Sequence, residues 1–284
     1  MAITVHERGV APSLASYVVA DLRPASVTVD ALAPRTEVAR PAVASRFEAS
    51  IILPAFNEAE ALPSVLRSLR QVIDHRYEII VVDDGSDDGT AEIAAQYNCT
   101  VLRHPKNLGK GAAVRTGLRA AGGRFVVIMD ADNTYPVGAI PEMVALSERF
   151  DFIRGTRLYE SATQMPLVNK IGNKLFDNIL RMLHGLEGAD HLTGLYGLHR
   201  NILLGMNLSA NRFDLEVEIG IKAHALKLRS MAMPIIYSER IGAKKLSPLR
   251  DGWCILRRCV RMASDHHPVL RMIRGHKSEE NSWG

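Results

Sequence analysis

The chain has 284 residues and a formal net charge of +4, and 47% of its residues are hydrophobic. This length allows one large α/β domain or two small ones, and the hydrophobic fraction is ample for a core. No apolar run approaches about 18 residues, which argues against a transmembrane helix. The N-terminus also lacks the apolar core of a secretory signal. Sparse aromatic residues argue against nucleic acid as a partner.

Neither cysteine nor histidine indicates a metal site. Cys99, Cys254 and Cys259 lack the spacing of metal ligands, and so few cysteines favour free thiols in a reducing, cytoplasmic compartment. The histidines, including His266 and His267, also lack ligand spacing, and we expect them at the surface.

Strands and helices are predicted from Ala49 onward. Residues 1–46 are rich in Ala, Val, Pro, Ser and Thr without periodicity, which predicts an irregular extension. Short apolar runs then predict four strands, at 50–54, 77–82, 100–103 and 125–129. Helical spacing of apolar residues predicts helices between them, at 58–73, 90–97 and 111–121. This alternation predicts an α/β fold with a mostly parallel, twisted sheet flanked by helices.

Polar side chains follow three of these strands, at 54–58, 83–86 and 130–132. Because the carboxyl ends of parallel strands meet at one edge of a sheet, a single nucleotide-sized ligand could contact all three segments. Asp130 and Asp132 end the buried run 125–129, and carboxylate oxygens are ligands that Mg²⁺ and Mn²⁺ prefer. The sequence therefore predicts a site for a divalent metal and a diphosphate at this edge.

A glycine-rich turn, Gly109-Lys110-Gly111, opens the predicted helix 111–121. Backbone N–H groups at a helix start and a lysine both suit a phosphate. The turn does not match the P-loop pattern, and no Gly-x-Gly-x-x-Gly motif is present. These absences disfavour a P-loop NTPase and a dinucleotide-dependent oxidoreductase.

Four motifs in order resemble those of family 2 glycosyltransferases. They lie at 51–58 (Ile-Ile-Leu-Pro-Ala-Phe-Asn-Glu), 81–86 (Val-Val-Asp-Asp-Gly-Ser), 107–112 (Asn-x-Gly-Lys-Gly-Ala) and 130–132 (Asp-Ala-Asp). The resemblance covers about residues 49–250 and implies an inverting enzyme with the GT-A nucleotide-diphospho-sugar transferase fold. We accordingly expect a catalytic domain at 47–247, between the extension 1–46 and a tail at 248–284. The Gln-x-x-Arg-Trp signature of processive synthases is absent, which disfavours polymerisation.

The second half resembles the polyprenyl-phosphate sugar synthases of that family, the dolichyl-phosphate mannose synthases among them. The similar segments are 155–157, 169–173, 193–196, 213–218 and 239–246. This likeness implies that the base and ribose of the donor contact Pro54, Phe56, Glu58 and Asp84. It implies that the diphosphate and metal contact Asp130, Ala131 and Asp132. It implies that the phosphates of donor and acceptor are surrounded by Arg157, Lys222, Arg240 and Lys245, and Lys110 is a further phosphate candidate.

Two departures from the synthase pattern leave the sugar unassigned. Thr134 stands where the mannose synthases carry a glutamine ligand for the metal. Residues 243–246 read Ala-Lys-Lys-Leu where the family usually has Glu-Ser-Lys-Leu.

The nature of the acceptor determines which residues catalyse. A phosphate acceptor is already anionic at neutral pH and needs cations to position it, for which Arg240, Lys244 and Lys245 are candidates. A hydroxyl acceptor needs a carboxylate base, for which Asp214, Glu216 and Glu218 are candidates. In a helix, Asp214 and Glu218 would share one face. We take Asp132, Arg240, Lys245 and Asp214 as the catalytic candidates.

The tail 248–284 interleaves apolar residues with arginines, as a basic amphipathic helix does. One interpretation places it on an anionic membrane, at the inner face of the cytoplasmic membrane. The other packs it on the catalytic domain or at the interface of a homo-oligomer.

Three functions are compatible with these patterns. The first is metal-dependent, inverting transfer of a hexose from a nucleotide-sugar to a polyprenyl phosphate. The second keeps the transferase but gives it a small phosphorylated or natural-product acceptor. The third is a catalytically silent subunit that binds a nucleotide-sugar, against which the intact pair Asp130 and Asp132 argues.

Overall fold

The computed structural model describes residues 45–157, 167–243 and 248–266. Predictions for residues 1–44, for Lys244 and Lys245, and for the tail beyond residue 266 lie outside the described residues. The chain divides into two compact units, Met1–Arg40 and Pro41–Gly284, and all described residues belong to the second.

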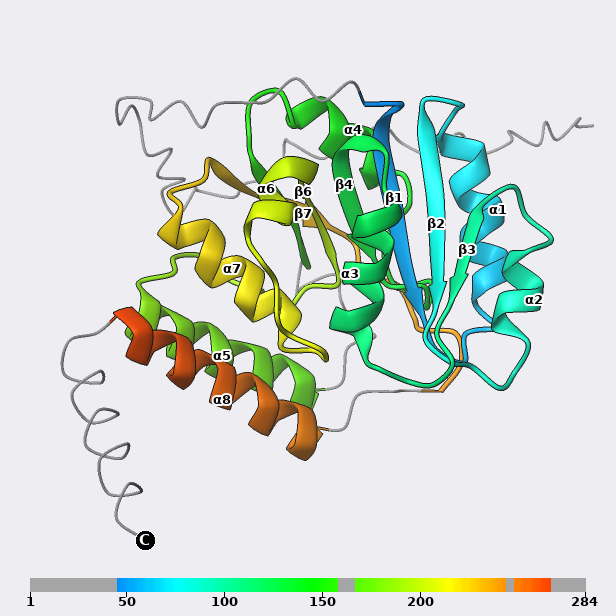
Figure 1. The fold of residues 1–284 in the computed structure, drawn as a ribbon. Coiled ribbons are helices and arrows are strands. Elements are labelled where there is room, and N and C mark those ends of the chain that lie inside the picture. Colours follow the sequence, from blue (N-terminus) through cyan, green and yellow to red (C-terminus); the bar gives the residue numbers. More distant parts are fainter. Residues whose placement is uncertain (1–44, 158–166, 244–247, 267–284) are drawn as a thin grey trace, which may run out of the picture. The chain divides into compact units, whose positions relative to one another are not determined.

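A seven-stranded sheet lies at the centre of this second unit (Figure 1). In chain order its strands are β1 (Phe47–Ala55), β2 (Tyr77–Asp83), β3 (Thr100–Arg103), β4 (Gly123–Met129), β5 (Phe152–Arg157), β6 (Leu195–His199) and β7 (Ser230–Ile235). Their order across the sheet is β3-β2-β1-β4-β6-β5-β7. All neighbours are parallel except that β6 runs antiparallel to both β4 and β5. The predicted mostly parallel sheet is therefore confirmed.

Helices pack on both faces of the sheet. In chain order they are α1 (Leu62–Val72), α2 (Thr90–Ala94), α3 (Lys110–Ala120), α4 (Ala139–Leu146), α5 (Leu167–His184), α6 (Arg200–Gly205), α7 (Leu215–Ala225) and α8 (Pro248–His266). Buried residues of α1, α2 and α4 join the core on one face, and those of α3, α6 and α7 join the core on the other. Side chains of β1 alternate between these cores: Ile51 and Leu53 pack into the first, and Ile52 packs into the second.

The helices predicted between the first strands are present but shorter. The helix predicted over 58–73 begins at Leu62, and Pro63 in its first turn suits a helix start because proline has no N–H to donate. The helix predicted over 90–97 ends at Ala94. Both helices lie where the pattern put them, and only their ends differ.

The reversed strand β6 brings the second half of the chain to the end of β4. Its direction places Gly194, just before β6, beside Asp130, just after β4, and the Asp130 N–H donates to the Gly194 carbonyl (3.2 Å). Within β6, a side chain at Gly197 would overlap the ring of Phe125. Glycine at position 197 therefore leaves the space that the Phe125 ring of β4 occupies.

Helix α8 packs on the domain through one face. Ile255 and Cys259 are buried in a third core that also includes Leu180 of α5 and Val217 of α7. The Arg258 guanidinium adds a salt bridge to Asp214 (2.8 Å). The described part of the tail thus packs on the domain, as one of its two interpretations expected. No helix among the described residues is long and apolar enough to cross a membrane.

The thiol of Cys259 offers a test of this packing. Cys259 is fully enclosed, and burial raises the pKa of its thiol to about 11. At pH 8 only about one molecule in a thousand then carries the reactive thiolate. We expect iodoacetamide to alkylate Cys259 far more slowly than the half-buried Cys254, as measured by peptide mass spectrometry. Denaturant should abolish the difference; equal rates in the native protein would mean that α8 leaves the domain readily.

Candidate functional site

The loops that follow the parallel strands gather at one edge of the sheet, at the bottom of Figure 1. Asn57, after β1, fastens two of these loops together: its N–H donates to Ser86 Oγ (2.9 Å), and its Oδ1 accepts from the Asp87 N–H (3.0 Å). Its φ of 54° is left-handed, a conformation that asparagine tolerates better than most residues. The loops after β1 and β2 therefore form one connected wall.

Lys110, the first residue of α3, is buried between two carboxylates. Its Nζ lies 2.5 Å from Asp130 Oδ1 at the end of β4 and 2.5 Å from Glu216 Oε1 on α7, and its side chain is 8% exposed. Burial alone would lower the pKa of the ammonium, but the two carboxylates outweigh it and raise that pKa well above its usual value. Lys110 therefore stays charged and joins three elements at one point.

Asp132 is held by two partners. Thr134 donates to Asp132 Oδ1 from its N–H (3.1 Å) and from its hydroxyl (2.5 Å), and Asn133 between them adopts a left-handed φ of 67° that allows this tight turn. Asp132 Oδ2 accepts from Arg240 Nη1 (2.5 Å). Burial and the neighbouring Asp130 carboxylate raise the pKa of Asp132, while Thr134 and Arg240 oppose the shift.

Arg240 links the ends of two strands. Besides Asp132, after β4, its guanidinium donates from Nη2 to Glu58 Oε1, after β1 (2.5 Å). Its side chain is 26% exposed, so the guanidinium remains accessible from outside. Ile241 follows and donates its N–H to the Asp132 carbonyl (3.1 Å), which fixes the segment against the site. Arg240 therefore joins the predicted metal ligand Asp132 to the predicted donor-binding residue Glu58.

A divalent metal fits the donor set that Asp130 and Asp132 provide. Both carboxylates are hard oxygen ligands at the same strand end. Among residues 45–157, 167–243 and 248–266, no cluster of three or more His, Cys, Asp or Glu side chains could hold a metal ion. Mg²⁺ is commonly held by one or two carboxylates, with water and substrate phosphates in its other positions. Asp130 and Asp132 are the residues that would hold such an ion.

The glycine-rich turn makes several bonds within the protein. The N–H groups of Leu108 and Gly109 donate to Asp84 (2.9 and 2.7 Å), and the Gly111 N–H donates to the Asn211 carbonyl (2.9 Å). A side chain at Gly109 or Gly111 would overlap the backbone of residues 210 and 211. The glycines thus permit a backbone contact, and the N–H groups of Leu108, Gly109 and Gly111 are hydrogen-bonded within the protein.

Asp84 is likewise occupied by protein groups. Besides the turn, its carboxylate contacts His104 Nδ1 (2.7 Å), and His104 Nε2 contacts Thr116 Oγ1 (2.9 Å). Asp84 is 3% exposed. These bonds position the turn, and the contact of Asp84 with the donor's base stays a prediction. Of the other predicted base and ribose residues, Pro54 and Phe56 are half-buried at the end of β1, and Ala131 is buried between the two acids.

Arg157, at the end of β5, forms a buried ion pair with Asp190 that involves both its Nε and its Nη2. It also donates to the Leu192 carbonyl (3.1 Å) and lies over the ring of Tyr237 (5.4 Å from the guanidinium carbon to the centroid). Arg157 therefore serves to connect the loop before β6 to β5. Sequence reasoning did not identify Asp190, because nothing in its local sequence marks its partner.

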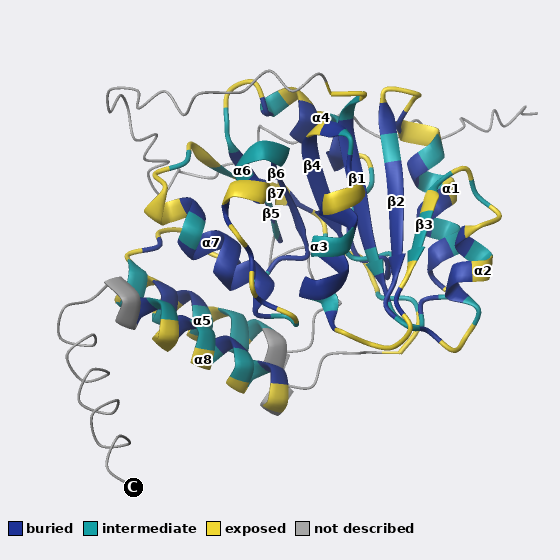
Figure 2. Cartoon of the chain, in the orientation of Figure 1, coloured by how far each residue is buried: buried dark blue, intermediate teal, exposed yellow. Residues whose placement is uncertain are grey.

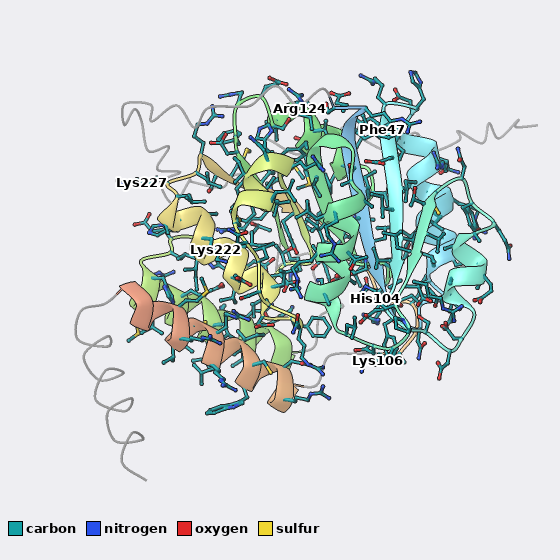
Figure 3. All side chains as sticks on the ribbon, viewed as in Figure 1. Phe47, His104, Lys106, Arg124, Lys222 and Lys227 are labelled. Carbon is teal, nitrogen blue, oxygen red and sulfur yellow. The ribbon has the colours of Figure 1, made fainter. Side chains whose placement is uncertain are left out.

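Two other predicted site residues are bound elsewhere. Lys222 Nζ donates to the carbonyls of Met206 and Asn207 (2.8 and 3.1 Å) and to Glu218 (2.6 Å), so its charge fixes α7 to the preceding loop. Figure 3 shows Lys222 on α7, well apart from His104 at the edge where the strands end. Asp214 accepts from Arg258 of α8 and from the Arg212 N–H (3.1 Å). The predicted sharing of one face by Asp214 and Glu218 is confirmed, since Arg258 contacts both.

Several histidines differ from the surface positions that we expected. His104, His191 and His199 are buried, at 5–8% exposure, and each is bonded to a side chain or carbonyl within the fold. His191 pairs with Asp177 of α5 (2.8 Å). A small cavity lies next to His191 and is lined by Arg154, Tyr196 and Glu216, with room for about one water molecule.

Sequence comparison identifies the family. The profile of glycosyl transferase family 2 matches residues 50–186. A dolichyl-phosphate hexose transferase of Haloferax volcanii is 31% identical over 214 residues, which cover 75% of this chain and 92% of that protein. The chain belongs to glycosyl transferase family 2. A second relative from the same organism, glycosyltransferase AglJ, is 28% identical over 78% of this chain and 73% of its own length.

Solved structures with a similar architecture are glycosyltransferases of the GT-A fold. A glucosyl-3-phosphoglycerate synthase of Mycobacterium tuberculosis, in complex with Mn²⁺, UDP-glucose and phosphoglyceric acid, aligns with a TM-score of 0.62 and 22% identity over 77% of this chain and 80% of its own. A mannosyl-3-phosphoglycerate synthase of Rubrobacter xylanophilus aligns with a TM-score of 0.62 and 21% identity, over 76% of this chain and 74% of its own. This family 2 glycosyltransferase thus has the predicted GT-A fold.

Gly194 provides a way to move Asp130 without changing it. A methyl group at Gly194 would overlap the Asp130 carboxylate, which can rotate away because it ends a side chain. We expect Gly194→Ala to weaken Mn²⁺-dependent binding of a nucleotide-sugar at least tenfold, measured by isothermal titration calorimetry. Circular dichroism should show an unchanged fold.

Gly138→Ala is the matched control, because a methyl group at Gly138 would meet no atom within 4 Å. It should bind as the wild type does. Wild-type affinity in Gly194→Ala would show that the orientation of Asp130 does not matter for donor binding.

Proposed function

We propose that this glycosyltransferase transfers a hexose, with inversion and with a divalent metal, from a nucleotide-sugar to a polyprenyl phosphate. The observation that carries the proposal is the position of Arg240, a solvent-accessible guanidinium beside both the metal-site acid Asp132 and Glu58. A cation there suits an acceptor that is itself a phosphate. The 31% identity to a dolichyl-phosphate hexose transferase supports the same acceptor.

The donor side of the proposed site is built on Asp130 and Asp132. Together they bind Mg²⁺ or Mn²⁺, which when bound neutralises the diphosphate leaving group. Lys110 Nζ pairs with Asp130 Oδ1 (2.5 Å), and the Thr134 hydroxyl donates to Asp132 Oδ1 (2.5 Å). Both carboxylates are therefore oriented before a ligand arrives, which reduces the ordering that binding requires.

The acceptor side needs no general base. A phosphate monoester attacks through an oxygen that is already anionic, so a cation that orients it opposite the leaving group suffices. The structure occupies the carboxylates that would serve a hydroxyl acceptor: Asp214 and Glu218 contact Arg258, and Glu216 contacts Lys110. This arrangement favours a phosphate. We include Lys245 in the proposed acceptor site from the sequence alone, since it lies outside the described residues.

A small phosphorylated acceptor is the second candidate. It is favoured by the structural similarity to synthases named for 3-phosphoglycerate, although identities of 21–22% establish the fold alone. Both candidates present a phosphate to Arg240, and they differ in whether the acceptor carries a lipid. Cytoplasmic location, with access to the membrane for the lipid acceptor, belongs to the proposal.

Donor binding can be tested by thermal shift with GDP-, UDP- and dTDP-sugars, with and without Mn²⁺. A ligand that binds only the folded state at about 100 times its Kd adds about 2.7 kcal/mol, or roughly 5–10 °C in Tm. We expect one nucleotide class to give such a shift only with Mn²⁺, and Asp132→Asn to abolish it. No shift with any donor, or an unchanged shift in Asp132→Asn, would contradict the proposed site.

The acceptor can be tested by transfer of radiolabelled sugar from the donor so identified. We expect label in an organic-extractable product with a polyprenyl phosphate and none with 3-phosphoglycerate; the reverse result would select the second candidate. Arg240→Gln should raise the KM for the acceptor about tenfold or more, since a charge-assisted hydrogen bond is worth about 1.5–3 kcal/mol, and should change the donor Kd less. Arg119→Gln, at an exposed arginine of α3, is the control. A larger loss for the donor would assign Arg240 to the donor side.

A further inference from the structure

The exposed apolar side chains of the protein are concentrated on two helices. Ten large hydrophobic residues are exposed in the described part of the chain, and five of them belong to α5 and α8. These five are Ile171 (59%), Leu175 (57%), Met182 (84%), Trp253 (66%) and Val260 (48%). Scattered single hydrophobic residues are normal on a protein surface, but a group on two packed helices calls for a partner.

The charged residues among them have one sign. The described exposed side chains of α5 and α8 include five cations, which are Lys174, Arg181, Arg250, Arg257 and Arg261. The acids of the same described segments, Asp177 and Asp251, are buried. Asn178 completes the exposed set, which therefore has five apolar residues, five cations and no anion. We call these eleven residues the α5–α8 face.

The α5–α8 face is the outer side of two adjacent helices. On α5 the exposed residues recur at i, i+4, i+7 and i+11 from Ile171, and on α8 at i, i+3, i+7 and i+10 from Arg250, which is one side of each helix. The opposite side of α8 is packed through Ile255 and Cys259 into the core shared with α5 and α7. The two helices lie side by side (Figure 1), and exposed residues of α8 follow the edge turned away from α7 (Figure 2).

We propose that the α5–α8 face binds the surface of an anionic lipid bilayer. A tryptophan and aliphatic side chains beside arginines are what an interfacial helix presents to lipid: the apolar groups enter the boundary of headgroups and acyl chains, and the cations meet anionic headgroups. Each arginine near such a surface strengthens binding about fivefold. The helices lie flat on the membrane, and their packed sides keep their contacts with the domain.

The composition of the face favours a bilayer over other partners. A second copy of the face would bring five cations against five, at a repulsive cost. Nucleic acid would satisfy the cations but would leave Ile171, Leu175 and Met182 without a contact. An anionic bilayer satisfies both kinds of side chain at once.

This inference deepens the proposed function, since it supplies the surface through which a lipid-linked acceptor reaches the site. Vesicle binding can be measured without an acceptor, so a failure of this inference can be distinguished from a failure of the proposed function. The full chain is sedimented with vesicles of phosphatidylcholine alone, or of phosphatidylcholine mixed with phosphatidylglycerol. We expect binding to the mixed vesicles, much weaker binding to phosphatidylcholine, and loss of binding as salt is raised.

Matched variants separate the face from general charge and hydrophobicity. Arg250→Gln/Arg257→Gln should weaken binding about 25-fold, from about fivefold for each arginine, whereas Arg119→Gln/Arg149→Gln, which removes two exposed arginines elsewhere, should change it little. Leu175→Gln should weaken binding several-fold, and Leu226→Gln, at an exposed leucine after α7, should not. Each variant's thermal shift with donor should equal that of the wild type.

Tryptophan fluorescence gives an independent readout. The chain has two tryptophans, so Trp283→Phe leaves Trp253 alone, and its emission should shift to the blue on the mixed vesicles. Wild-type protein that does not sediment with the mixed vesicles would overturn the proposal. Equal losses of vesicle binding in the two double-arginine variants would also overturn it. A third contrary result would be the absence of vesicle binding together with a dimer, seen by analytical ultracentrifugation, that Leu175→Gln dissociates.

Discussion

The buried ammonium of Lys110 connects the two halves of this glycosyltransferase. Removing a charge from water costs several kcal/mol, which is recovered only where partners are close and well oriented. Asp130 and Glu216 provide those partners at 2.5 Å, from β4 and from α7. The ammonium can reach both because Gly109 and Gly111 let the start of α3 touch the backbone of residues 210 and 211. The position of Asp130, which we propose as a metal ligand, thus depends on a contact between segments that are distant in sequence.

Other parts of the site follow the same principle of long-range ionic contacts. Arg240 reaches back to Glu58 and Asp132, and Arg157 pairs with Asp190 before β6. The reversed direction of β6 makes the contact between Arg157 and Asp190 possible, because it brings the beginning of that strand to the ends of β4 and β5. A sheet with β6 parallel would put Gly194 at the opposite edge from Asp130. The direction of this one strand therefore brings Asp190 and Gly194 to the edge of the sheet where the candidate site lies.

The sequence predicts the first four strands well, because each is a short run with apolar residues that is bounded by turn residues. Strands β1, β2 and β4 are buried on both faces, whereas the edge strand β3 is only partly buried. The sequence also locates Asp130, Asp132 and Glu58, which end such strands. It does not predict ion-pair partners, since Lys110 is marked only as a cation after a glycine and its two carboxylates come from other elements. Nor does the sequence show that N–H groups of the glycine-rich turn bond to Asp84 and to the Asn211 carbonyl; the phosphate role of this turn stays a prediction. Lys222 did carry a local signal: its i, i+4 spacing from Glu218 is that of a helical salt bridge.

Arg240 is joined to α8 by residues 241–247 alone. An extended chain advances at most about 3.6 Å per residue, so Arg240 and the first residue of α8 lie within about 30 Å of each other. The same connection limits the distance between the site at the strand ends and a bilayer bound to α8. This limit is about the thickness of the hydrocarbon core of a bilayer. The polyprenyl phosphate that we propose as acceptor would have to bridge this distance with its own isoprenoid chain, and the length of that chain would then be a criterion of selection.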